Sequence, residues 1–306
     1  MLFVLFAMLL LPIGAWAEDY GFSIGGVAVG SGNIASFQNS GVSYDADSKT
    51  LTLENATIDR LCVNVTSGFI IDLKGKNTIT ASTDTAAIFS NINPAASLPI
   101  TIKSSSTPVG SLTITPGNNY YMAYSGVSFT YQNGLSLIPD AQYLGVGQTA
   151  VVGVSYGLTV AGVKVTNANA AGIAGDGITG GTVTFTPAGD APATLTLNGA
   201  YIFHTDEENA IISSLSTPLY VHLLGENTIN SQSFLPFEGA TGDDADLVFT
   251  TTTDAAPGSL TMTSSHADFG KTTFYTGFNE VQYPENSGFL YAKEDESGNV
   301  IITIGR

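Results

Sequence analysis

The chain has 306 residues, and its 26 Asp plus Glu against 9 Lys plus Arg give a formal net charge of −17. Because phosphate backbones repel so acidic a surface, these numbers argue against nucleic acid as a partner. Cys62 is the only cysteine, so an intrachain disulfide is excluded, and its flanking sequence LCVNV predicts a buried, unreactive thiol on a strand.

The first 17 residues carry no charged side chain and have the features of a secretory signal peptide. An apolar run from Leu2 to Leu11 leads into Ala15-Trp16-Ala17, a small-x-small cleavage pattern. We therefore predict cleavage after Ala17 and a secreted protein, either extracellular or periplasmic. The mature chain then contains no tryptophan, and no later stretch is apolar and long enough for a transmembrane segment.

After the signal peptide, apolar and polar residues alternate with period two, which predicts strands with one buried face. Such segments lie at 50–58, 69–75, 111–115 and 259–263. In the first of them Leu51 and Leu53 are expected to point inward. The best helical candidate, 86–97, is interrupted by Pro94. The sequence therefore predicts an all-β chain.

Four phrases of the first half recur in the second half in the same order, at offsets of 136, 144, 150 and 148 residues. The pairs are 20–29 with 156–165, 51–58 with 195–202, 73–79 with 223–229, and 110–115 with 258–263. We therefore predict a signal peptide at 1–17 and two tandem copies at 18–155 and 156–306. Since no Pro- or Ser-rich linker separates the copies, we expect one continuous body, with two separate compact domains as the alternative.

The strand spacing within a copy favours a right-handed parallel β-helix, a solenoid, built from the two copies. Ile58, Ile79 and Ile100 follow each other at intervals of 21 residues, which fits one coil of such a solenoid. A pair of β-sandwiches, whose strands return every 8–12 residues or so, is the alternative.

The twin phrases LKGKNTI (73–79) and LLGENTI (223–229) are predicted to be coil corners. Asn and Gly tolerate the left-handed backbone that corners need, and asparagines on successive coils can also stack as a ladder. Lys76 is replaced by Glu226 in the second copy, so a charged ligand site would not be maintained. Binding residues are therefore expected in the loops where the two copies differ.

The phrases GITGGTVTF (177–185), LTLENATI (51–58) and the two corner motifs resemble those of exported β-helical proteins of anaerobic bacteria, described as carbohydrate-binding domain proteins. Some relatives in that group bind cellulose or acidic sugars, with calcium. The resemblance covers most of both copies and implies a β-helical fold and a role in carbohydrate binding. It carries over no ligand residue.

Catalytic patterns are missing from the sequence. A β-helical lyase generally needs a basic residue beside calcium, and the arginines are only Arg60 and Arg306. A β-helical hydrolase needs clustered aspartates together with a His-Gly pair and an Arg-x-Lys pattern, and this sequence contains neither His-Gly nor Arg-x-Lys. The carboxylates of GDDAD (242–246) could form an acid–base pair, but no partner residues are evident. We predict no enzyme, and a polysaccharide lyase or hydrolase is the third alternative for the function.

Calcium is the predicted cofactor. Asp243, Asp244 and Asp246 lie within four residues of one another, and calcium readily takes clustered carboxylates with loop carbonyls. Two further acidic runs, 45–47 and 206–208, are weaker candidates. None spells a complete calcium loop, and a solvated acidic loop is the alternative.

Aromatic residues in corresponding parts of the two copies are candidates for stacking on sugar rings: Tyr120, Tyr121, Tyr124, Phe274 and Tyr275. The alternative is that they close the apolar core at the end of a copy. The sequence thus predicts a secreted, non-catalytic protein that binds polysaccharide or a cell-surface glycan. A structural, adhesin-like surface protein with a protein partner is the alternative, and the oligomeric state is left open.

Overall fold

The structure is a computed structural model and is dominated by strands, which form 54% of the chain. It describes residues 17–65, 68–82, 84–92, 98–123, 127–139, 145–205, 208–231, 234–239, 245–252, 257–264, 275–283, 290–294 and 300–304. The helical elements among them are α1 (Ile34–Phe37) and the 3₁₀ helix η2 (Gln38–Ser40). The predicted all-β class is confirmed. No helix in the described part of the chain has the length and apolarity that a bilayer span requires.

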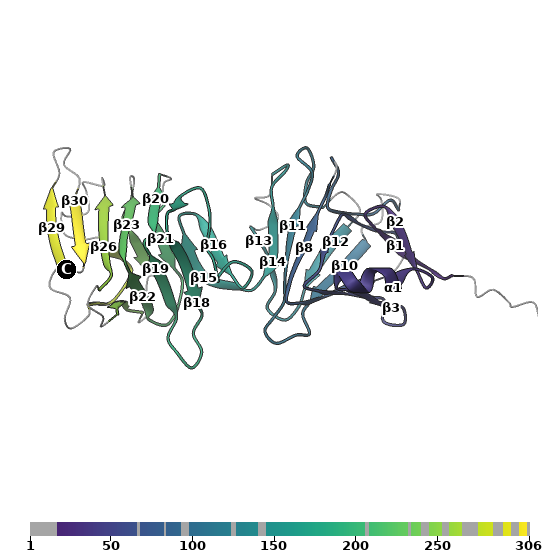
Figure 1. The fold of residues 1–306 in the computed structure, drawn as a ribbon, viewed down its shortest axis with the longest axis horizontal. Coiled ribbons are helices and arrows are strands. Elements are labelled where there is room, and N and C mark those ends of the chain that lie inside the picture. The colour runs from purple at the N-terminus through teal and green to yellow at the C-terminus, as the bar shows by residue number, and fades with distance from the viewer. Residues whose placement is uncertain are drawn as a thin grey trace, which may run out of the picture. The chain divides into compact units, whose positions relative to one another are not determined.

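The chain divides into two compact units, Met1–Val152 and Gly153–Arg306. This division lies three residues before the copy boundary expected from the sequence. Each unit contains three sheets and its own buried apolar residues. Figure 1 shows the strands of both units in chain order by colour. The expectation of one continuous body stays a prediction.

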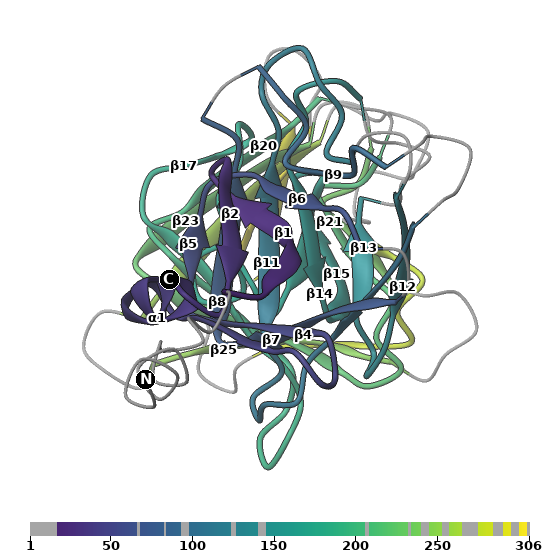
Figure 2. The same cartoon turned by 90° about the vertical axis from the view of Figure 1, so that its right-hand side faces the viewer.

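The first unit contains three mixed sheets. The first has the order β12 (Val127–Tyr131), β10 (Leu98–Lys103), β7 (Phe69–Lys74), β4 (Thr50–Glu54), β3 (Val42–Asp45). The second has the order β13 (Ser136–Ile138), β14 (Ala150–Gly153), β11 (Ser111–Thr115), β8 (Lys76–Thr80), β5 (Thr57–Ile58). The third has the order β2 (Val27–Gly30), β1 (Asp19–Ile24), β6 (Leu61–Val63), β9 (Ile88–Phe89). Figure 2 shows α1 beside these sheets, and no residue of α1 is buried.

The chain visits these three sheets in a repeating order. It runs from β4 to β5 to β6, then from β7 to β8 to β9, and then from β10 to β11. Strands of successive rounds pair in parallel, so Leu51 lies opposite Ile71, and Ile58 lies opposite Ile79. Leu51 and Leu53 are fully buried, as the alternation predicted. The 21-residue interval between Ile58 and Ile79 is therefore the distance between paired positions of neighbouring strands. The predicted interval from Ile79 to Ile100 is not, because Ile100 lies in the first sheet opposite Phe69, and Ile79 pairs with Ile114.

The second unit repeats this strand order. Its first sheet has the order β18 (Thr182–Thr186), β19 (Thr194–Asn198), β22 (Leu219–Leu224), β25 (Leu247–Thr251), β28 (Val281–Gln282). Its second sheet has the order β17 (Ile178–Thr179), β20 (Tyr201–His204), β23 (Glu226–Ser231), β26 (Ser259–Ser264), β30 (Val300–Ile304), β29 (Leu290–Glu294). Its third sheet has the order β16 (Val163–Thr166), β15 (Ser155–Val160), β21 (Ile211–Ser213), β24 (Phe237–Gly239), β27 (Tyr275–Thr276). The rounds β19–β20–β21 and β22–β23–β24 again pair in parallel.

Antiparallel strands cover at least one end of each parallel stack, so the sheets are mixed and not purely parallel. In the first unit β3 pairs with β4, β1 pairs with β6, and β14 pairs with β11, all antiparallel. In the second unit β18 pairs with β19, β15 pairs with β21, and β30 pairs with β26, all antiparallel. An uncovered edge strand is a template for aggregation, and these strands satisfy its backbone groups.

Asn77 and Asn227 are structural corner residues, each 2% exposed. The side-chain oxygen of Asn77 accepts from the Ala56 N–H at 2.8 Å, and its amide nitrogen donates to the Ser111 carbonyl at 3.1 Å. Asn227 makes the equivalent bonds to Ala200 and Ser259 at 2.9 and 3.0 Å. Each asparagine thus joins three successive rounds of backbone. A ladder does not form toward the following strand, because there Asn77 pairs with Leu112 and Asn227 with Leu260.

Cys62 on β6 is buried, 4% exposed, and its sulfur lies 3.4 Å from the Asn91 amide nitrogen. Burial raises the pKa of this thiol, although hydrogen bonds from neighbours oppose the shift. We expect an aromatic disulfide reagent at pH 8 to modify the native protein roughly a hundredfold more slowly than the urea-unfolded chain. Stoichiometric labelling of the native protein within seconds would contradict this expectation.

Candidate functional site

Four of the eight residues predicted for ligand or metal binding lie outside the described residues: Tyr124, Phe274, Asp243 and Asp244. Of the others, Tyr120 and Tyr121 precede the point where Ala123 bridges to Ile88 in the third sheet of the first unit. The Tyr120 carbonyl accepts from the Gly147 N–H at 2.8 Å, and the Tyr121 side chain is 54% exposed. Tyr121 therefore presents an aromatic ring to solvent.

Tyr275 belongs to the second unit and packs against its core. It lies on β27 and pairs with Phe237 of β24. By strand register its counterpart in the first unit is Ala123, which is not aromatic. Nearby, Tyr283 stacks on Phe249 with ring centroids 6.0 Å apart, and burial raises the pKa of Tyr283. These contacts give Tyr275 a role in closing the core.

Asp246 is the described member of the predicted calcium cluster. One of its carboxylate oxygens accepts from the Gln282 side-chain amide at 3.4 Å, and its main-chain carbonyl accepts from Leu219 at 2.9 Å. Among the described residues, no group of three or more His, Cys, Asp or Glu could hold a metal ion. The calcium site therefore stays a prediction.

Other carboxylates bond to the backbone and to serines of a neighbouring round. Asp59 accepts from both the main-chain N–H and the hydroxyl of Ser82, at 3.0 and 2.7 Å. Burial alone would raise the pKa of Asp59, but these bonds, the Arg60 N–H and the Arg60 charge together lower it. Asp72 contacts Ser105 in the same manner, at 2.8 and 2.6 Å. Part of the acidity of the chain is thus used in holding rounds together.

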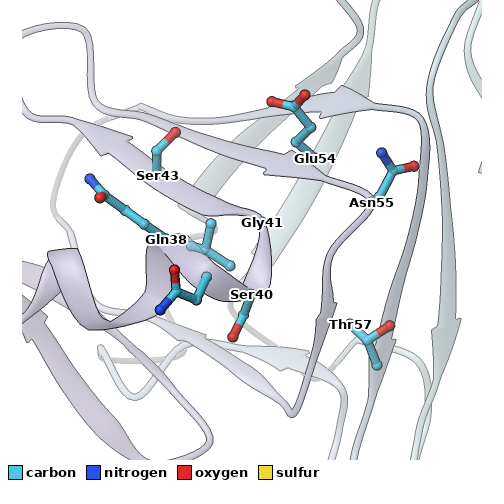
Figure 3. A pocket seen from close by; sticks show the side chains of 9 residues that line it. Gln38, Ser40, Gly41, Ser43, Glu54, Asn55 and Thr57 are labelled. Carbon is cyan, nitrogen blue, oxygen red and sulfur yellow. The ribbon is translucent and has the colours of Figure 1, made fainter.

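A polar groove in the first unit is the candidate functional site (Figure 3). It is open to solvent and has a volume of about 680 Å³. Its lining consists of amide, hydroxyl and carboxylate side chains with one apolar residue and one glycine: Gln38, Asn39, Ser40, Gly41, Val42, Ser43, Glu54, Asn55 and Thr57. One wall comes from η2 and the start of β3, and the other from the corner between β4 and β5.

Gly41 determines how closely the two walls approach. It ends η2 in the left-handed conformation, with φ +75°. Its carbonyl accepts from the Glu54 N–H at 2.8 Å, and a Cβ at this position would overlap with the Glu54 carbonyl oxygen. Only glycine combines this φ with such a close approach. The groove therefore depends on glycine at position 41.

Asn55 holds the opposite wall at the corner. It adopts φ +51°, and its main-chain N–H donates to the Lys74 carbonyl at 3.0 Å. Its side-chain oxygen accepts from the Lys76 N–H at 3.2 Å, which fixes the orientation of the amide. The amide nitrogen of Asn55 lies on the side of Glu54 in Figure 3. The groove thus presents a fixed donor next to a carboxylate acceptor.

No groove residue was named from the sequence, but the region was indicated. Binding residues were expected where the two copies differ, and they differ directly after the first antiparallel strand pair of each copy, β1–β2 and β15–β16. The first unit has α1 and η2 there, at 34–40, whereas the second unit has β17 between β16 and β18. No regular alternation marks 34–41, so only comparison of the two copies could have drawn attention to it.

Comparison of the chain with protein-family models, with curated proteins and with solved structures gives no match. The family resemblance of the turn-and-strand phrases therefore stays a prediction. Function is inferred from the residues of the groove.

Proposed function

We propose that this chain is a secreted, non-catalytic carbohydrate-binding protein, and that the groove of the first unit is its glycan site. The proposal rests on the composition of the groove: three amides, three hydroxyls and one carboxylate converge on one open volume. Sugars offer hydroxyls that both donate and accept, so a mixed set of donors and acceptors complements them. A groove open to solvent also admits a chain longer than one sugar.

The groove supports binding more than hydrolysis. Glycoside hydrolysis requires two carboxyl groups on either side of the scissile bond, roughly 5–10 Å apart. Glu54 is the only carboxylate in the groove lining. We therefore propose that the groove binds glycans without cleaving them. Cleavage of a glycan by the purified protein at a rate above that in buffer would overturn this.

We further propose that each unit is a short right-handed parallel β-helix of three sheets. The repeating order in which the chain visits the sheets supports this, because successive strands of one sheet are parallel. Parallel strands joined by a crossover are almost always connected right-handedly. Calcium assistance through Asp243, Asp244 and Asp246 is part of the proposal and is tested separately with a chelator.

The groove is tested with Asn55→Gly, which copies the second unit. Gly199 occupies the equivalent corner there, at φ +61°, and its N–H donates to the Leu224 carbonyl. The substitution therefore removes the amide and keeps the backbone. We expect roughly tenfold weaker binding, since one hydrogen bond to a ligand is worth about 1.4 kcal/mol here.

Binding is measured on a glycan array, and the retained glycan is then titrated calorimetrically, with and without chelator. Asn133→Gly is the matched control, because Asn133 also has a left-handed backbone, at φ +59°, and does not line the groove. This control should bind as the unchanged protein does. No glycan retained in either buffer would overturn the proposed function, and equal losses in the two variants would move the site away from the groove.

A further inference from the structure

We propose that the groove selects uncharged glycans over uronates, and that Glu54 is the residue that determines this specificity. The inference rests on the proposed function and specifies its ligand class. Glu54 is the only charged side chain in the lining, and it is exposed at the end of β4. All other polar groups in the groove are neutral amides and hydroxyls.

An ionised carboxylate accepts hydrogen bonds and cannot donate them. Glu54 can therefore accept from the hydroxyls of a neutral sugar, while the neighbouring Asn55 amide donates to a ring or hydroxyl oxygen. A uronate carboxylate at the same place would meet another acceptor of like charge. Repulsion between two carboxylates in contact near a protein surface is large enough to reverse the preference for a ligand.

The second unit indicates that the fold does not need this charge. Glu54 lies opposite Lys74 in the parallel register of β4 and β7. The equivalent pair in the second unit is Asn198 and Leu224, and both are uncharged. The corner forms in either case, with Gly75 at φ +65° and Gly225 at φ +64°. The corner therefore does not need the charges at 54 and 74, and of the two residues Glu54 lines the groove.

Lys74 moderates the effect of Glu54. Lys74 is the neighbour of Glu54 across the strand pair. Its positive charge therefore partly cancels the repulsion between the Glu54 carboxylate and an approaching anion. Removing Lys74 should strengthen the discrimination against uronates, and removing the Glu54 charge should weaken it. The two substitutions thus act in opposite directions, which a general loss of structure would not produce.

The overall charge of −17 also repels polyanions, so the local effect must be separated from the global one. Salt screens interactions beyond about 8 Å at 0.15 M, whereas groups in contact are screened much less. Glu226→Gln is the matched control, because Glu226 is an exposed acid of the second unit, where it corresponds to Lys76, and its substitution changes the net charge equally.

The experiment uses the full mature chain and oligosaccharides in pairs, each a neutral hexasaccharide and its C6-carboxylated form. The neutral members are β-1,4-glucose, α-1,4-glucose and α-1,4-galactose. Binding is measured at 0.15 M salt. We expect at least tenfold tighter binding of the neutral member, a ratio reduced at least threefold in Glu54→Gln, and a larger ratio in Lys74→Met.

Glu226→Gln should leave the ratio unchanged. Equal binding of the two members of a pair by the unchanged protein, tighter binding of the uronates, or equal shifts in Glu54→Gln and Glu226→Gln would each overturn the selectivity while leaving glycan binding intact. Binding of neither member of any pair, together with an empty glycan array, would overturn the proposed function and with it this inference.

Discussion

Replacing Asn77 with alanine should lower the free energy of unfolding of the first unit by about 4 kcal/mol. The side chain bonds to the Ala56 N–H and to the carbonyls of Lys74, Gly75 and Ser111, at 2.8 to 3.3 Å. Each buried group left without a partner costs roughly 1–3 kcal/mol, and alanine supplies none of these bonds. Urea unfolding followed by far-ultraviolet circular dichroism measures the loss.

Asn227→Ala should destabilise the second unit by a similar amount, because the equivalent bonds are present there. Cys62 separates the two effects, since it is the only thiol of the chain and lies in the first unit. Its labelling should accelerate in Asn77→Ala and stay unchanged in Asn227→Ala. Asn198→Ala, an exposed asparagine, should change stability by less than about 0.5 kcal/mol. Equal labelling rates in the two corner variants would show that they do not act on separate units.

Sequence reasoning located these corners because two independent signals agreed there. The alternation of apolar residues indicated which side chains point inward, and the internal repeat showed at which positions the two copies have different residues. Lys76 and Glu226 differ in charge while Asn77 and Asn227 do not, and only the asparagines are buried. A residue kept in both copies of one chain while its neighbours vary therefore indicates architecture, and here that inference agrees with the hydrogen bonds.

The antiparallel strands at the ends of each stack were not predicted, for a physical reason. A strand such as β14 alternates in the same way whichever direction its neighbour runs, so period two carries no information about parallel or antiparallel pairing. Parallel pairing throughout was predicted because the 21-residue interval was applied to every strand of a copy. The end strands lie outside that interval.

The groove was missed because one of its walls, at 38–43, comes from residues without a periodic signal. Gln38, Ser40 and Ser43 are polar and exposed, as in many surface loops, and nothing in their order predicts that they face Glu54 and Asn55. Their juxtaposition depends on backbone geometry at one glycine. Tyr275, in contrast, was named as a candidate because aromatic residues occur in corresponding parts of the two copies, and the structure packs it against the core. Recurrence of aromatic residues in two copies does not separate a core aromatic from a ligand platform.

Gly41→Ala is the second substitution with a large expected effect, about 3 kcal/mol or more of lost stability in the first unit. A Cβ at this position would overlap with the backbone carbonyl of Glu54, and φ is +75°. Backbone cannot move aside as a flexible side chain can, so either β3 separates from β4 or η2 shifts. Either response changes the distance between the groove walls, and glycan binding should fall together with stability.

Gly134→Ala separates backbone strain from overlap. Gly134 lies in the same unit at φ +76°, nearly the same as Gly41, and no atom lies within 4 Å of a Cβ built there. This control should lose only the left-handed strain, about 1 kcal/mol, part of which the stiffer unfolded chain offsets. The difference between the two variants in urea unfolding therefore measures the overlap at Gly41. If both variants lost the same stability and bound glycan equally well, close approach at Gly41 would not be what shapes the groove.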